Sequence, residues 1–321
     1  MIKKILPALL LTLFLAAFAY LKRTPSITAQ AKSDVIPQNY IVVLNDNVAD
    51  PSSVANEHAR LHGLALGHIY KSVIKGYSAV ISDQELAKIK SDPRVKFVSQ
   101  DHRVTIEAPA QSASTRKPVK VSPTPTLSPA QTTPTGVGRI GLNASNKGKG
   151  VGVAVIDTGI DLTHPDLAAN IVANTTCVAR TNDGNDDNGH GSHVAGTIAA
   201  VDNTIGVVGV APQAKLIAVK VLDSSGNGSW SSVICGIDWV TSNASRYNIK
   251  VANMSLGGSG SGDNNCGLTN NDALHQAICN STKNSGVAYV VAAGNNGTNT
   301  SGFVPAAYDD TVITVSALAD S

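Results

Sequence analysis

The chain of 321 residues is long enough for two domains, and its apolar content of 42% is ordinary for a globular protein with a sizeable core. Charged residues make up only 15% of the sequence, and the formal net charge is +2. Nothing in this balance points to nucleic acid or an acidic partner, and we expect no nucleic acid partner.

The first 23 residues have the pattern of an export signal. Lysines precede an apolar run from Ile5 to Leu21, which closes on Lys22-Arg23 and contains the cleavage-like motif Ala17-Phe18-Ala19. We therefore predict a secreted or cell-surface protein. Because the run approaches the length of a membrane span, the alternative is that the segment is not cleaved and serves as a membrane anchor. Only in that case would the protein contact a membrane.

Residues 37–107 are predicted to form a small α+β domain. Strand and helix patterns follow one another in the order β-α-β-β-α-β, as in ferredoxin-like domains. Gly63 is the expected end of the first helix, and Ser82 with Glu85 has the spacing of a capping box before the second. The expected elements are a strand at Asn39–Leu44, a helix at Ser53–His62, a hairpin-like region at His68–Ile81 and a strand at Val95–Ile106.

Residues 108–130 differ sharply in composition from what precedes and follows them. Pro, Ser, Thr, Ala and Gln predominate, and large apolar residues are few. Such a segment buries too little surface to order itself, so we predict a linker.

Residues 131–321 alternate between continuous apolar runs and helical patterns. Runs of this kind are expected for strands that are buried on both faces, and the alternation predicts a doubly wound parallel α/β sheet with helices on both faces. The expected strands are Val151–Ile156, Leu216–Leu222, Val251–Leu256, Val287–Ala293 and Thr311–Leu318, and the expected helices are His190–Val201, Ser229–Ser245 and Asp272–Lys283.

Polar residues stand where two of these strands end, which is where functional groups gather in such sheets. Asp157 ends the first run and is followed by a Thr-Gly turn, and Ala292-Ala293-Gly294-Asn295 ends the fourth. The glycines at 148, 150 and 152 resemble a dinucleotide fingerprint, but they precede the strand instead of following it. A carboxylate at 157 could orient a histidine, and the amide of Asn295 could stabilise an oxyanion.

His190 lies between two glycines at the start of a predicted helix of small residues. A neutral imidazole there can act as a general base near pH 7. His190 and His193 also form an H-x-x-H pair, but no third ligand stands at a suitable helical spacing for a zinc site. We therefore favour a catalytic role for His190 and helix packing for His193.

Four cysteines in an exported chain favour two disulfides, for which three connectivities exist. The short separation favours Cys266 with Cys279, which leaves Cys177 for Cys235.

Taken together, four motifs closely resemble those of the subtilisin-like serine proteases and occur in the same order. They are Asp157-Thr158-Gly159, the Gly189–Gly196 segment, Asn253-Met254-Ser255-Leu256-Gly257-Gly258 and Ala292–Asn295. Val219–Asp223 through Gly226 and Trp230 looks most like the proteinase K branch. Residues 39–107 resemble the inhibitory propeptide of such enzymes.

The resemblance implies a role for each motif. Asp157 would orient His190, which would serve as general base and then general acid, and Asn295 would donate to the oxyanion. Polypeptides would be the substrates, and the propeptide would inhibit its own enzyme, which we expect to be a monomer. Two walls of the pocket would give a broad apolar preference, with Gly226 on the strand that pairs with substrate. The wall residues are Ser255, Leu256, Gly257, Ala292, Ala293 and Gly294.

A structural calcium ion is also implied by the resemblance, because the family's ligands have matching oxygen donors here. The donors are the side chains of Gln131, Asp166 and Asn203 and the carbonyls of Val201, Ile205 and Val207.

The family's nucleophilic serine stands in a Gly-Thr-Ser-Met-Ala-like segment that residues 1–321 do not contain. We expect the sequence to be a fragment of a complete protease. The alternative is a non-catalytic relative that binds peptides. Propeptide cleavage is expected between Glu107 and Gln131.

Overall fold

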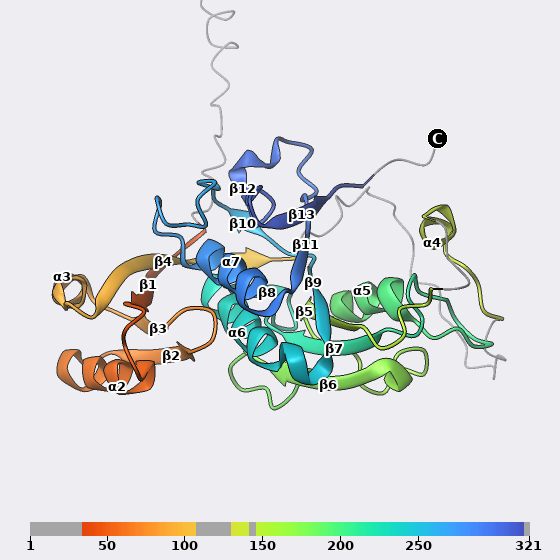
Figure 1. Cartoon of the computed structure of the whole chain (residues 1–321), viewed down its shortest axis with the longest axis horizontal. Coiled ribbons are helices and arrows are strands. Elements are labelled where there is room, and N and C mark those ends of the chain that lie inside the picture. The colour runs from red at the N-terminus through yellow and green to blue at the C-terminus, as the bar shows by residue number, and fades with distance from the viewer. Residues whose placement is uncertain (1–33, 107–129, 141–145, 318–321) are drawn as a thin grey trace, which may run out of the picture. The chain divides into compact units, whose positions relative to one another are not determined.

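The computed structural model describes residues 34–106, 130–140 and 146–317 (Figure 1). The predicted export segment 1–23 and residues 108–129 of the predicted linker lie outside the described residues. Within the described ranges, no helix is long and apolar enough to cross a membrane.

The N-terminal domain, residues 34–106, contains the predicted β-α-β-β-α-β order. Its strands form one antiparallel sheet in the order β2-β3-β1-β4, and a short strand, β8 (Asn227–Ser229), extends that sheet beyond β4. The elements are β1 (Val35–Leu44), α2 (Pro51–His62), β2 (Ala65–Tyr70), β3 (Gly76–Val80), α3 (Asp83–Ser91) and β4 (Val95–Thr105).

The two helices of this domain begin and end at residues suited to those positions. Asp50 caps α2 by accepting hydrogen bonds from the backbone of Ser52 and Ser53, and Pro51 is the first helical residue, so the helix starts two residues before its predicted start. Gly63 ends α2 at φ 65°, as predicted. Ser82 caps α3, as the capping-box spacing indicated.

The larger sheet has six strands in the order β13-β11-β9-β5-β7-β6, and every neighbouring pair is parallel. This confirms the predicted fold class. Its strands are β5 (Gly152–Asp157), β6 (Ile171–Thr176), β7 (Lys215–Lys220), β9 (Ile249–Met254), β11 (Ala288–Ala292) and β13 (Val312–Val315).

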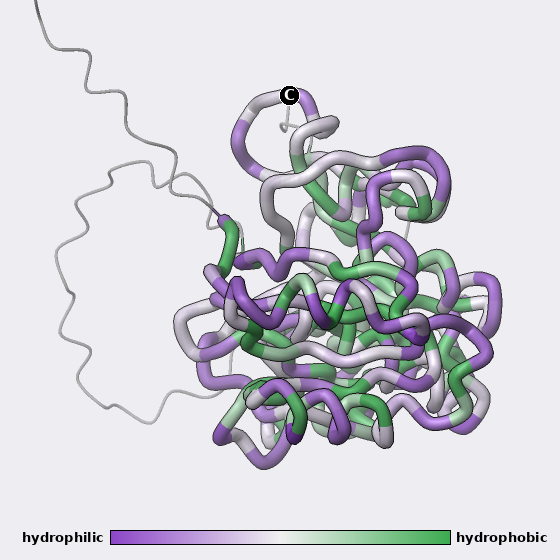
Figure 2. Tube along the Cα trace, turned by 90° about the vertical axis from the view of Figure 1, so that its left-hand side faces the viewer, coloured by the Kyte–Doolittle hydropathy of each residue, from purple (hydrophilic) through white to green (hydrophobic). Residues whose placement is uncertain are grey.

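Helices cover both faces of this sheet. Alternate residues of each strand point to opposite faces, so each strand contributes side chains to two cores. Val153 and Val155 share a core with α5 (His190–Ala199). Ala154 and Ile156 share the other core with α6 (Trp230–Tyr247) and α7 (Ala273–Ser285). The hydrophobic parts of the trace run through these inner layers (Figure 2).

Several short elements were not predicted. The edge strand β6 has the polar residues Asn174, Thr175 and Thr176 and only partial burial, so it lacks the continuous apolar run used to find the inner strands. The helix α4 (Thr135–Arg139) contains two glycines, which weaken its helical pattern. A two-residue pair, β10 (Gly258–Ser259) with β12 (Phe303–Val304), is too short to give a periodic signal.

Both disulfides that the spacing favoured are present. Cys177 bonds to Cys235 and Cys266 to Cys279, with Cα atoms 6.0 and 5.8 Å apart. The first joins the end of β6 to α6, and the second ties α7 to the loop before it.

Candidate active site

Asp157 and His190 come together at the carboxyl edge of the parallel sheet. Asp157 is the last residue of β5 and has no exposed surface, whereas His190 is the first residue of α5 and is partly exposed. The Nδ1 atom of His190 lies 2.8 Å from Oδ1 of Asp157. A proton on Nδ1 would therefore leave the lone pair on Nε2 for proton transfer.

The first turn of α5 is fixed by a network around Asp186. This carboxylate accepts hydrogen bonds from the backbone of Gly189 (3.0 Å) and Ser192 (2.9 Å), and from the hydroxyl of Thr158 (2.9 Å). Thr158 in turn accepts a hydrogen bond from Gly191 N at 2.9 Å. A Cβ at position 191 would overlap the carbonyl of Gly159, so only glycine lets the helix approach β5 this closely.

Lys220 connects the ends of two strands to the loop before His190. Its buried Nζ atom donates to the carbonyls of Thr158 (2.6 Å) and Leu222 (3.0 Å) and to Oδ1 of Asp187 (2.6 Å). Neither Lys220 nor Asp186 was singled out from the sequence. The available signals were a lone lysine in an apolar strand and an acidic pair just before a helix start.

The electrostatics of the pair favour the protonated histidine. The hydrogen bond to Asp157 raises the pKa of His190, although partial burial opposes that rise. The pKa of Asp186 is lowered in spite of burial, because the backbone of Gly189 and the hydroxyl of Ser192 donate to its charged form.

The other predicted site residues lie at neighbouring strand ends. Ser255, Leu256 and Gly257 follow β9, and Ala292 ends β11, where Val291 pairs with Met254. Ala293, Gly294 and Asn295 continue from β11, and Asn295 is exposed. The two predicted walls are therefore side by side.

The end of β4 lies between Gly226 and Gly257. Thr105 exchanges two backbone hydrogen bonds with Gly257, of 3.2 and 3.1 Å, and Ile106 N donates to Gly226 O at 3.0 Å. On the side of Gly226, β4 pairs antiparallel with β8, which begins at Asn227. The N-terminal domain thus supplies a central strand in a three-stranded arrangement at the site.

Two carboxylates hold the N-terminal domain against α6. Asp101 of β4 accepts from the backbone (3.1 Å) and hydroxyl (2.6 Å) of Ser231 in the first turn of the helix. Asp238 of α6 accepts from the backbone of Lys71, Ser72 and Val73. Burial raises the pKa of both carboxyl groups.

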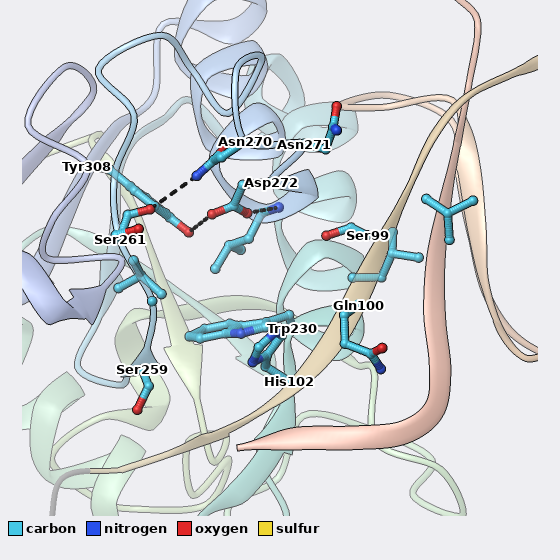
Figure 3. A pocket seen from close by; sticks show the side chains of 15 residues that line it. Ser99, Gln100, His102, Trp230, Ser259, Ser261, Asn270, Asn271, Asp272 and Tyr308 are labelled. Atoms are coloured by element: carbon cyan, nitrogen blue, oxygen red, sulfur yellow. Dashed lines mark hydrogen bonds between the residues drawn. The ribbon is translucent and has the colours of Figure 1, made fainter. Parts of the chain in front are cut away.

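A pocket of about 360 Å³ lies beside this contact and is lined by Gln100 and His102 of β4 and by Trp230 and Ser259 (Figure 3). Its far side is formed by Asp272, which accepts a hydrogen bond of 2.6 Å from the hydroxyl of Tyr308.

The six predicted calcium ligands gather in one loop region. Gln131 Nε2 donates to the carbonyl of Val201 at 2.8 Å and of Val207 at 3.4 Å. Asn203 Nδ2 donates to Oδ1 of Asp166 at 2.8 Å, and Asn203 Oδ1 accepts from Ile205 N at 2.7 Å. Both amide nitrogens thus lie against oxygen atoms that would be ligands. Rotation of the Gln131 amide by half a turn would present its oxygen, whereas the same rotation of Asn203 would break the hydrogen bond from Ile205 N. The carboxylate of Asp166 and the nearby carbonyls are oxygen donors of the kind that a hard cation binds.

A second acidic group surrounds the buried His275. Its Nε2 lies 2.6 Å from Oδ1 of Asp310, and its Nδ1 lies 3.3 Å from Oδ1 of Asp263 without hydrogen-bond geometry. Asp263 accepts four backbone hydrogen bonds, so its oxygens are committed to the loop that follows it. The ring of Tyr308 stacks on the imidazole with centroids 4.0 Å apart. Each ring nitrogen of His275 thus has a carboxylate oxygen beside it.

His193 is exposed, so its expected role in helix packing is wrong. The packing face of α5 is formed by Gly191, Ala195 and Ala199, which are buried.

Comparison with known proteins adds independent findings. The model described as Subtilase family matches residues 148–321, and that described as Peptidase inhibitor I9 matches residues 39–107. Subtilisin E of Bacillus subtilis (strain 168) is 38% identical over 248 residues, 74% of this chain and 55% of that protein. An alkaline protease of Shouchella clausii is 36% identical over 283 residues, 87% of this chain and 62% of that protein. The solved structure of a cold adapted subtilisin-like serine proteinase is 37% identical, with a TM-score of 0.44, over 54% of this chain and 56% of that chain. This chain thus spans less than two thirds of the length of each.

Proposed function

This chain belongs to the subtilase family, with a peptidase inhibitor I9 domain before the subtilase domain, and we propose that the complete protein is a secreted serine endopeptidase made as a zymogen. The observation that carries the proposal is the 2.8 Å contact between the buried Asp157 and the partly exposed His190 at the sheet edge. Such a pair turns a serine hydroxyl into a nucleophile.

In this proposal, His190 takes the proton from the serine hydroxyl and later gives it to the leaving amine. Asp157 holds the imidazole in the required tautomer and stabilises its charged form. The side-chain amide of Asn295 donates to the oxyanion of the tetrahedral intermediate. The serine itself is proposed to lie outside residues 1–321, in keeping with the greater length of the relatives.

We propose that the N-terminal domain inhibits the enzyme by occupying the groove that binds substrate. The pairing of Thr105 with Gly257 and of Ile106 with Gly226 supports this role, because an extended substrate would use the same backbone groups. Cleavage of the precursor is proposed between Glu107 and Gln131. Residues 1–23, 37–107, 108–130 and 131–321 would then be the export segment, propeptide, linker and first part of the catalytic domain.

The finer assignments are also proposals. The walls at Ser255–Gly257 and Ala292–Gly294 would give an apolar preference, and the Val219–Asp223 segment supports a proteinase K-like branch. Calcium would be held by Gln131, Asp166 and Asn203 with nearby carbonyls, where it would stabilise the loops that they join.

The test is to express the complete precursor, with the coding sequence read beyond codon 321, and to measure peptide hydrolysis. We expect hydrolysis that is blocked by a serine-directed fluorophosphonate and abolished by His190→Ala. Peptide binding without hydrolysis by the complete protein would favour the non-catalytic alternative. Hydrolysis that survives His190→Ala would contradict the proposed mechanism.

A further inference from the structure

Lys220 is a buried cation at the carboxyl end of β7. Only 1% of its side chain is exposed, and residues 216–219 before it in the strand are apolar and buried. Its ammonium group has three protons, and the structure provides three acceptors: the carbonyls of Thr158 and Leu222 and the carboxylate of Asp187. The buried charge therefore has a complete set of hydrogen bonds, one of them to a charged partner.

Stability alone does not explain a lysine at this position. A buried ion pair can often be replaced by apolar side chains of similar volume with little change in the stability of the fold, or with a gain. Methionine at position 220 would continue the apolar run of β7 and would need no polar partners. The contacts of Lys220 therefore point to a role in fixing the positions of its partners.

Two of these contacts hold the end of the strand that carries Asp157. Asp157 and Lys220 are paired residues in the parallel register of β5 and β7. The ammonium of Lys220 donates to the carbonyl of Thr158, whose N–H in turn donates to Oδ1 of Asp157 at 2.7 Å. Since the carbonyl of Leu222 accepts from the same ammonium, the two strand ends are joined beside the carboxylate.

The third contact holds the loop that leads into the first turn of α5. The Nζ atom of Lys220 lies 2.6 Å from Oδ1 of Asp187, which stands three residues before His190. The side chain of Asp187 is half-exposed, so the buried ammonium anchors a loop that otherwise faces solvent. Asn188, the next residue of the loop, accepts a hydrogen bond of 3.2 Å from His190 N. A shift of this loop would therefore move the backbone of His190.

We propose that Lys220 is a positioning residue of the catalytic pair, which holds the strand end that carries Asp157 and the loop that leads to His190 in the arrangement that gives their 2.8 Å contact. The inference rests on the proposed protease function and adds to it a residue that touches no substrate. Because all three contacts meet at one ammonium, removal of that group releases the strand end and the loop together. Misplacement of a catalytic group by about 1 Å can lower the rate by about 10²-fold.

The experiment compares Lys220→Met with Lys215→Met in the complete, activated protein. Lys215 is the first residue of the same strand and is exposed, so it is the matched control. We expect Lys220→Met to lower kcat by about 10²-fold with little change in KM, and Lys215→Met to change neither. Circular dichroism and the Tm of each variant separate a loss of fold from a loss of rate.

The charge of Lys220 has a second readout in the NMR titration of His190. A cation near the pair disfavours protonation of the imidazole, and its removal leaves the carboxylate of Asp187 without a counter-charge. Lys220→Met should therefore move the midpoint of the His190 titration to higher pH, whereas Asp187→Asn should move it to lower pH. The other carboxylates that act on the imidazole, Asp157 and Asp186, are the same in both variants.

Asp187→Asn also keeps the proposal testable if Lys220→Met does not fold, because this side chain is half-exposed. We expect it to lower kcat by about tenfold, since it releases the loop but not the strand end. An unchanged kcat in folded Lys220→Met, or the same His190 midpoint in wild type and both variants, would overturn the proposal. Absence of both hydrolysis and fluorophosphonate labelling in the wild-type protein would instead refute the proposed protease function, and the His190 titration would still decide whether Lys220 acts on the pair.

Discussion

The Asp157–His190 corner and the predicted calcium loop both bring together residues from distant parts of the chain, but they differ in how far their side chains are prepared. At the corner, Oδ1 of Asp157 accepts from both Thr158 N, at 2.7 Å, and the imidazole. At the loop, the amides of Gln131 and Asn203 turn their nitrogens toward the oxygens that would bind the ion. The corner is therefore preorganised by the fold, whereas at the loop the amides of Gln131 and Asn203 make hydrogen bonds that binding of the proposed ion would have to break.

The largest expected effect is at the corner. Asp157→Asn keeps the shape of the side chain but favours the wrong tautomer of His190, and we expect kcat of the activated enzyme to fall by about 10⁴-fold. Steady-state kinetics on a peptide substrate measures this, with circular dichroism to confirm folding. A loss of less than about tenfold would mean that the pair has no triad function.

A smaller effect is expected from Asp186, which touches no substrate in the proposed mechanism and acts by positioning the first turn of α5. Asp186→Asn weakens the hydrogen bonds to Gly189 and Ser192, and a misplaced catalytic group can cost about 10²-fold in rate. We expect kcat to fall while KM changes little. Asp183→Asn, at an exposed neighbouring carboxylate, is the matched control. Equal kinetics for these two variants would show that the network around Asp186 does not set the rate.

The sequence predicted the two residues of the corner, Asp157 and His190, better than the residues that hold them in place, Asp186 and Lys220. Asp157 and His190 could be found because a carboxylate at a strand end and a histidine between glycines are local signals. The roles of Asp186 and Lys220 depend on contacts across the fold, such as the one from Lys220 to Thr158, and local patterns carry little information about them.

The inner strands of the sheet were also predicted from a local signal, their runs of apolar residues. Its inner strands are mostly apolar, because both faces are covered, whereas the edge strand β6 is half-exposed and polar and was missed. The predicted calcium residues came from the resemblance alone, and no local pattern showed that loops at 131, 166 and 203 would meet.

Calcium is expected to change the thermal stability of the protein through the predicted calcium loop. An ion at about 100 times its dissociation constant stabilises the native state by about 2.7 kcal/mol, which corresponds to a rise in Tm of about 5–11 °C for a domain of this size. We expect calcium to raise the Tm of the complete protein by this amount and a chelator to reverse the change. Asp166→Asn should remove the response, whereas Asp202→Asn, an exposed carboxylate paired with Lys147, should retain it. A response that Asp166→Asn leaves intact would place the ion elsewhere.

The smallest effect concerns the pH dependence of the corner. Asp157 raises the pKa of His190 above its ordinary 6.5, so the neutral base is lost at a higher pH than for a free imidazole. We expect the acid limb of kcat/KM to have its midpoint above 6.5 and to move to lower pH in Asp157→Asn.

The same shift has a defined sign for stability. Because the folded-state pKa is raised, the protonated imidazole contributes stability that is fully present below the unfolded pKa and is lost as the pH rises through the folded pKa. Histidine NMR titration of wild type and Asp157→Asn, each assigned with His190→Ala, measures the shift directly. An unchanged midpoint in Asp157→Asn would mean that the hydrogen bond does not set the protonation of the base, and the corner would then be prepared in geometry alone.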